Sequence, residues 1–338
     1  VIFSLIAIFI SVLMIFNFLV IQKDGYPNRV PEMLRGDLAR YDLLKNQKGK
    51  NCHDNIEGCN FNTSSNKKVY IIGDSHMGSL LFNLKDRIVK SNYQFITSTL
   101  NGCLFYPGFN RVNDKTQKID ENCNESYFQK VKQTLSNDKN SIIIFGGRHP
   151  LYLSNYFFDN KEGGFEGLEW GNKYILTGKY DTIQNSFKSE ILEFSKNNKI
   201  ILIYPIPEVG WQFPQKLLNK IPKQINLIKD YLVPKNYITT SFEVYENRTK
   251  SSFELLDSIK SDNIYRVYPH KLFCDTTIKD RCVTHDDKNI FYDDKDHPSI
   301  KGSEMINDLI MKEIEKIELK TKGMKKTERE KIYQEYSR

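Results

Sequence analysis

The first 22 positions of the chain are almost entirely apolar. They contain no charged side chain. Their polar members are Ser4, Ser11, Asn17 and Gln22. About 20 apolar residues are enough for a helix to cross the hydrocarbon core of a bilayer. A signal peptide is the competing interpretation, but its apolar region is shorter, follows a basic segment and ends at small residues. The pattern favours one transmembrane helix over residues 1–22.

From position 67 the pattern changes to short apolar runs separated by longer amphipathic segments. The runs lie at 67–73, 93–99, 141–147, 199–207 and 263–269. Most are apolar on both faces, as expected for central strands of a parallel sheet. Helix-like segments lie at 78–91, 125–135, 182–197, 215–231 and 300–318. This alternation predicts a doubly wound α/β domain without internal repeats.

The remaining segments divide the chain into four parts. Residues 23–66 are polar and interrupted by Pro and Gly, so we expect a connector outside the membrane, with a possible short helix over 30–44. The folded domain is predicted over 67–320. Residues 321–338 form a charged tail. Because the chain starts with Val1 and not with Met, we expect a longer polypeptide.

The charge balance says little about partners. The net charge is +7, and much of the excess lies in residues 320–331, for which a solvated tail is the favoured interpretation over binding to anionic glycans or lipids. No Lys/Arg stripe alternates with aromatic residues, so nucleic-acid binding is not expected.

The six cysteines form three pairs that are close in sequence. The pairs are Cys52 with Cys59, Cys103 with Cys123, and Cys274 with Cys282. Zinc binding is the main competitor, but the short spacing typical of zinc ligands is absent, and no metal is expected. Local disulfide pairing is the simplest arrangement among the many possible. Because disulfides persist in oxidising compartments, the part after the apolar helix is predicted to lie outside the cytoplasm.

A serine follows the first apolar run directly, in Gly73-Asp74-Ser75-His76. Ligands of parallel α/β sheets gather at the carboxyl ends of the strands. A serine there would start the next helix, where backbone N–H groups can stabilise an oxyanion. An ordinary helix cap is the simpler explanation of this short motif when it stands alone.

A second motif near the end of the chain changes that balance. Asp294 precedes His297 by three residues. A serine becomes a nucleophile when a base, usually histidine, removes its proton, and an acid then orients that histidine. Ser75, His297 and Asp294 are therefore the candidate catalytic residues, and no cofactor is implied.

The two motifs, in this order, resemble those of SGNH (GDSL-like) hydrolases. The resemblance implies a three-layer α/β/α sandwich with a five-stranded parallel sheet, similar to flavodoxin, and a triad of Ser75, Asp294 and His297. Gly102 matches the oxyanion-hole glycine of the family's second block. The family's third block normally carries an oxyanion asparagine, which this chain lacks.

The third block reads Gly146-Gly147-Arg148-His149. Gly147 is expected to let the substrate approach the backbone. Arg148 is a candidate replacement donor, because a guanidinium can bind developing negative charge; a structural ion pair is the equally weighted alternative. His149 is a rival for the same role.

The whole chain resembles a narrower subgroup. The apolar helix, the segments 25–31 and 205–211, and the Cys274–Cys282 loop are similar to the C-terminal SGNH domain fused to membrane acyltransferases of family three. Glu208 and Trp211, within 205–211, are assigned no catalytic role. Such proteins O-acylate lipopolysaccharide or other envelope glycans, which implies a periplasmic domain anchored in the inner membrane.

This resemblance predicts transfer of an acyl group, with acetyl expected, through an ester of Ser75 to a glycan hydroxyl. The acyl donor would be delivered by a membrane acyltransferase domain upstream in the same chain. A membrane-anchored carbohydrate O-acetyl esterase is the alternative, and a non-catalytic glycan-binding module is a third possibility.

Overall fold

The computed structural model describes residues 2–23, 44–220, 237–321 and 323. Most of the segment 30–44, the second part of the segment 215–231 and nearly all of the charged tail lie outside the described residues. The predictions made for these segments therefore stay predictions.

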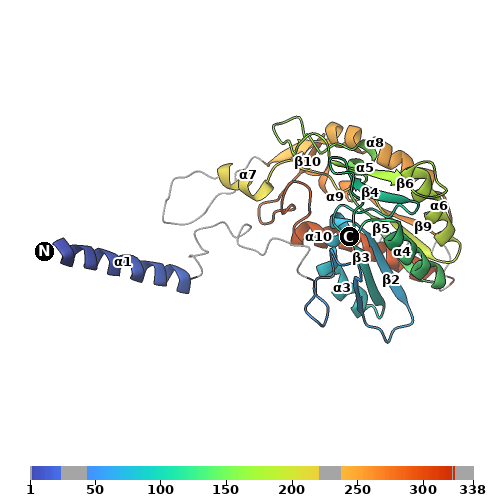
Figure 1. The fold of residues 1–338 in the computed structure, drawn as a ribbon, viewed down its shortest axis with the longest axis horizontal. Helices are drawn as coiled ribbons and strands as arrows, with labels where there is room; N and C mark the ends of the chain where they lie inside the picture. Colours follow the sequence, from blue (N-terminus) through green and yellow to red (C-terminus); the bar gives the residue numbers. More distant parts are fainter. Residues whose placement is uncertain (1, 24–43, 221–236, 322, 324–338) are drawn as a thin grey trace.

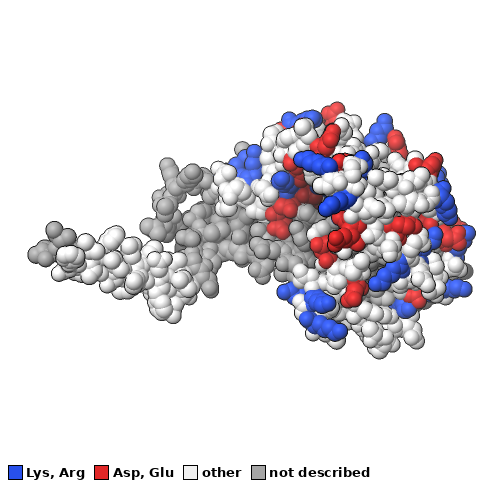
Figure 2. Space-filling model, in the orientation of Figure 1, with Lys and Arg blue, Asp and Glu red and all other residues white. Residues whose placement is uncertain are grey.

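The apolar N-terminal segment is a single helix, α1 (Ile2–Gln22). Its apolar stretch, Phe3–Gln22, has a mean hydropathy of 2.7 and is not buried by the rest of the described protein. Figure 2 shows no Lys, Arg, Asp or Glu on this helix, whereas both signs of charge are spread over the main body. The helix is thus long and apolar enough to cross a membrane, as its sequence predicts.

A mostly parallel sheet forms the centre of the main body (Figure 1). Its strands, in spatial order, are β1 (Cys59–Phe61), β3 (Gln94–Thr99), β2 (Lys68–Gly73), β5 (Ile142–Gly146), β7 (Lys199–Ile203) and β9 (Ile264–Val267). The five strands after β1 are parallel and correspond to the five apolar runs of the sequence.

The sheet has six strands, and the prediction of five is wrong in this respect. The additional strand, β1, pairs antiparallel with β3 at the edge of the sheet. It has only three residues and comes from the segment predicted as a connector, so no periodic pattern identifies it. A disulfide between Cys52 and Cys59 joins it to the preceding loop.

Helices cover both faces of the sheet because neighbouring side chains of a strand point to opposite faces. Val69 and Ile71 of β2 belong to one apolar cluster, and Tyr70 and Ile72 belong to the other. The first face is covered by α3 (Leu81–Lys90) and α10 (Ile300–Thr321). The second is covered by α4 (Glu125–Asn137), α6 (Ile183–Ser195) and the end of α8 (Phe242–Ser258). The α/β/α sandwich is therefore as predicted, while α8 was not predicted.

Short elements complete the described parts. They are the helices α2 (Ser75–Gly78), α5 (His149–Ser154), α7 (Phe213–Lys220) and α9 (His270–Phe273), and the strand pairs β4 (Phe109–Asn113) with β6 (Asn172–Leu176) and β8 (Thr239–Ser241) with β10 (Arg281–Val283). In the sheet β3 lies on one side of β2, and β5, the next strand of the sheet along the chain, lies on the other side. In such sheets the crevice at this reversal point binds ligands, beyond the carboxyl ends of the two strands.

The structure joins all six cysteines in the three local disulfides. The Cys103–Cys123 bond closes a loop with a sequence separation of 20, and Cys103 follows the candidate oxyanion residue Gly102. We expect replacement of both cysteines by serine to lower the free energy of unfolding by about 3 kcal/mol, because the unfolded chain regains the freedom of an open loop. Chemical denaturation checks this value. Free thiols in the native protein, counted by mass spectrometry, would contradict the pairing.

Candidate active site

Ser75 lies at the carboxyl end of β2, as the first residue of α2. Its position is set by Asp74, whose side chain accepts the backbone N–H of His76 at 2.9 Å and so caps the helix. The Ser75 hydroxyl lies 2.8 Å from Nε2 of His297, which is 222 residues away in the sequence. Folding therefore brings the two motifs within hydrogen-bond distance.

Asp294 orients the histidine from the same loop. Its Oδ2 lies 2.8 Å from Nδ1 of His297, and its Oδ1 accepts the backbone N–H groups of Asp296 at 2.9 Å and His297 at 2.8 Å. Burial alone would raise the pKa of Asp294, but the hydrogen bond and charge of His297 hold it below its usual value. An ionised Asp294 accepts Nδ1–H, which leaves Nε2 to accept the proton of Ser75.

The second oxygen of Asp74 links two strand ends. Its Oδ2 accepts the backbone N–H of Arg148 at 2.7 Å and the Tyr152 hydroxyl at 2.8 Å. Gly147 makes this close approach possible, because a Cβ there would lie 2.2 Å from Leu104 and 2.9 Å from the Asp74 carboxylate. Packing therefore requires glycine at position 147. This requirement is separate from the predicted role of Gly147 in letting the substrate approach the backbone.

Gly102 lines the same cavity as Ser75. Its φ of +59° favours glycine, and a Cβ there would lie 2.8 Å from the Arg111 guanidinium. Arg111 donates from Nη1 to the carbonyl oxygens of Asn101, at 2.7 Å, and Gly102, at 2.5 Å. These bonds and the neighbouring disulfide hold the backbone of this turn in place.

Arg148, the candidate oxyanion donor, makes ion pairs with acidic side chains in the structure. Its guanidinium is almost fully buried and binds three carboxylates, and Arg148 also lines the cavity that contains Ser75. Nε donates to Glu208 at 2.6 Å, Nη2 bonds to Glu166 and to Glu208, and Nη1 lies 3.1 Å from Asp296. The structural ion pair, which the sequence left as the alternative, describes this geometry.

His149, the rival donor, is fully buried and packs edge-on against the ring of Phe187. Burial lowers the pKa of His149 to about 4. It is not among the residues that line the cavity. His149 therefore lies away from the cavity, whereas Arg148 lines it with its guanidinium bound to carboxylates.

Four acidic or imidazole side chains beside the site were not predicted as parts of it. They are His76, Glu166, Glu208 and Asp296. Asp296 stands directly before His297 in the sequence, and that adjacency is the signal that could have identified it. Glu166 and Glu208 reach the site through tertiary contacts with Arg148, which no local pattern indicates.

A cavity of about 330 Å³ opens over Ser75 and His297. Its aromatic lining residues are Tyr152, Phe157 and Trp170, and Gln212 and Lys295 add polar groups. Ligand pockets commonly combine apolar walls with a few polar groups that fix orientation. The cavity thus places apolar walls and a few polar groups beside the Ser75 hydroxyl.

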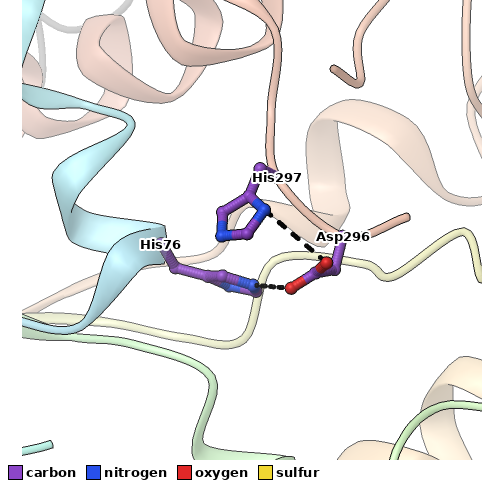
Figure 3. A group of neighbouring side chains, drawn as sticks. All are labelled: His76, Asp296 and His297. Atoms are coloured by element: carbon purple, nitrogen blue, oxygen red, sulfur yellow. Dashed lines mark hydrogen bonds and ion pairs between the residues drawn. The ribbon is translucent and has the colours of Figure 1, made fainter. Parts of the chain in front are cut away.

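His76, Asp296 and His297 bring potential metal-ligand atoms within 4.8 Å of one another (Figure 3). Both ring nitrogens of His297 already face Ser75 and Asp294. The remaining carboxylate is paired with the cationic Arg148. A metal ion would have to displace that guanidinium, so the donor set fits a metal poorly.

The fold and this arrangement of residues define an α/β/α domain of the SGNH type. Residues 44–312 match the family model described as the SGNH domain fused to AT3 domains. The chain belongs to this family.

The solved structures that are similar to this chain at low sequence identity include the following three. The periplasmic domain of a lipopolysaccharide acetyltransferase from Salmonella ser. Paratyphi A is 18% identical, with a TM-score of 0.48, and the match covers 86% of this chain and 95% of that one. A GDSL-like lipase from Bacteroides thetaiotaomicron VPI-5482 is 14% identical (TM-score 0.37, 74% and 88%). A possible lipase from Chitinophaga pinensis DSM 2588 is 12% identical (TM-score 0.33, 75% and 99%). No curated protein matches this chain.

Proposed function

We propose that this domain transfers an acyl group, with acetyl as the expected group, through an ester of Ser75 to a hydroxyl of a cell-envelope glycan. The observation that carries the proposal is the continuous chain of contacts from Ser75 Oγ to His297 and from His297 to Asp294, each of 2.8 Å. The family description, which notes fusion to AT3 domains, supports an acyl donor supplied by a membrane domain of the same polypeptide.

In the first half-reaction, His297 Nε2 takes the proton of Ser75 while Oγ bonds to the acyl carbonyl carbon. The tetrahedral intermediate then expels the donor's leaving group, which receives that proton from His297. In the second half-reaction a glycan hydroxyl gives its proton to His297 and attacks the ester, and Ser75 leaves with the proton. Water in place of the glycan makes the same site an esterase.

The negative charge of each intermediate needs donors at the carbonyl oxygen. Because Arg148 is bound to carboxylates, we assign this role to backbone N–H groups of Ser75, at the start of α2, and of Gly102. This arrangement requires no side-chain donor in the third block.

The location follows from two features. We propose that α1 crosses the inner membrane and that the disulfide-bonded domain lies on its periplasmic side. The acceptor would then be a glycan outside the cytoplasm.

A direct experiment tests the acyl-serine step. Purified full chain in detergent is incubated with an aryl acetate, and peptides are analysed by mass spectrometry for an acetyl group on Ser75. Adding an acetylatable glycan separates transfer from hydrolysis, because a transferase moves the label to the glycan while an esterase releases only acetate. An unlabelled Ser75 together with undiminished turnover would refute the covalent mechanism.

Trp170 provides a test of the acceptor side. It lines the cavity, is partly exposed and packs edge-on against Tyr152 at 5.0 Å between ring centres. We expect Trp170→Ala to raise KM for the glycan acceptor about fivefold, because an aromatic contact contributes on the order of 1 kcal/mol. Hydrolysis of a small acetate should change much less. Equal losses toward both substrates would place Trp170 in the support of the triad instead.

A further inference from the structure

Asp296 is a second carboxylate beside the candidate base. It is 6% exposed and directly precedes His297. Its Oδ1 lies 3.6 Å from Nδ1 of His297, the nitrogen that Asp294 also contacts. This distance is too long for a hydrogen bond, so the interaction is electrostatic. Figure 3 shows Asp296 beside the imidazole rings of His76 and His297, with a dashed line to each of them.

Two groups from other strands hold Asp296 in this position. Its Oδ2 lies 3.0 Å from Nε2 of His76, in the helix α2 that follows β2, and 3.1 Å from Nη1 of Arg148, which follows β5. Burial would raise the pKa of Asp296, but the charge of Arg148, followed by those of the two histidines, holds it well below its usual value. Asp296 is therefore ionised in the folded protein at neutral and alkaline pH.

Arg148 is itself held by acidic partners behind the site. Glu208 binds Arg148 and also accepts from Nε of Arg248 at 3.0 Å. The charges of these two arginines outweigh burial and hold the pKa of Glu208 below its usual value. Burying a charge costs desolvation free energy, and partners of opposite charge such as these offset that cost. The ion pairs thus form a fixed support whose outermost carboxylate faces His297.

We propose that Asp296 is a positioning residue of the acyl-transfer reaction: it stabilises the imidazolium that His297 becomes while it holds the proton of Ser75 or of the acceptor. This inference rests on the function proposed above. No bond to substrate is implied, and the proton stays on His297 until it passes to the leaving group. Asp294 orients the ring, and Asp296 adds a second negative charge.

Several charged or titratable groups surround His297. They are Asp294 and Asp296 on its own loop, His76 from the β2–α2 segment, Arg148 after β5, and, farther away, His53 from the segment before β1. Burial lowers the pKa of His297, but Asp296 and then Asp294 raise it, to about 9, against the smaller opposing effect of Arg148.

The consequence is a shifted pH profile. His297 must be neutral to accept the proton of Ser75, so the rate should rise with pH through the pKa of His297, that is, up to about 9. Removal of one carboxylate charge within a few ångströms changes a pKa by roughly 1–3 units. Without Asp296 the rise should therefore occur at lower pH, while kcat on the alkaline plateau falls because the imidazolium is less stabilised.

The test measures kcat/KM of the full chain in detergent for 4-nitrophenyl acetate between pH 6 and 10. Asp296→Asn is expected to move the midpoint down by about one unit or more. Asp287→Asn removes the same charge from an exposed position on the preceding loop and should leave the profile unchanged. A folded Asp296→Asn protein with the wild-type midpoint would overturn the proposal.

A second measurement needs no variant, in case Asp296→Asn does not fold. Labelling of Ser75 in the wild-type protein by a fluorophosphonate also requires neutral His297. An inflection of the labelling rate near pH 9 supports the proposal, and one near the ordinary histidine value of about 6.5 overturns it. If the wild type neither hydrolyses the ester nor reacts with the phosphonate, the proposed function itself fails and this inference fails with it.

Discussion

Replacement of Ser75 by alanine should reduce acetate ester hydrolysis and glycan acylation by several orders of magnitude. The variant lacks the hydroxyl oxygen that lies 2.8 Å from His297 Nε2 and would form the acyl ester. In enzymes with comparable triads, loss of one member leaves only the residual catalysis of binding and oxyanion stabilisation. Steady-state rates on an aryl acetate, together with phosphonate labelling, measure the effect.

The folded state should be little affected by this substitution. The backbone of α2 is held by the Asp74 cap and not by the Ser75 hydroxyl. Ser64→Ala, at an exposed position of the loop before β2, is a matched control and should retain full activity. If Ser75→Ala keeps more than a small fraction of the wild-type rate while its thermal unfolding is unchanged, another residue carries the nucleophile and the triad assignment is wrong.

Replacement of Arg148 by alanine should lower the free energy of unfolding of the domain more than a substitution at the surface does. It would leave Asp296, Glu166 and Glu208 buried without their shared cation. Removal of one partner from a buried ion pair commonly costs about 3–5 kcal/mol, because the remaining charge stays out of water. For a domain of this size the melting temperature should fall on the order of 10 °C. Differential scanning calorimetry measures the shift.

Arg87 provides the comparison. Its ion pair with Asp308 is exposed, with the two side chains 28% and 59% accessible to solvent. Arg87→Ala should therefore cost less than about 1 kcal/mol. The opposite result at Arg148 is equally informative. An unchanged melting temperature with a kcat lowered about 100- to 1000-fold would restore the role of oxyanion donor that the sequence suggested.

Local patterns in the sequence were sufficient for the central architecture. The central strands β2, β5 and β7 are runs whose residues are buried almost throughout on both faces, so their apolar composition distinguishes them from the flanking helices. The same is true of the helix α1, whose apolar length is a property of the chain itself. The pairing of neighbouring cysteines also followed from spacing, because short loops close easily.

The sequence also indicated which residues meet at the site, since a serine at a strand end and a distant Asp-x-x-His motif are informative together. It could not show how the third block is used. Arg148 follows a glycine pair in a way that suits an oxyanion donor, and its burial among three carboxylates depends on residues from other parts of the chain.

Only the tertiary structure decided the electrostatics of the base and the edge of the sheet. Asp296 faces His297 because Arg148 and His76, from two different strand ends, hold its other oxygen. The strand β1 exists because β3 offers an open edge to a short polar segment. Both features arise from contacts between segments that are distant in the sequence. The energies of these contacts depend on burial and distance, and neither can be predicted from the neighbouring residues in the sequence.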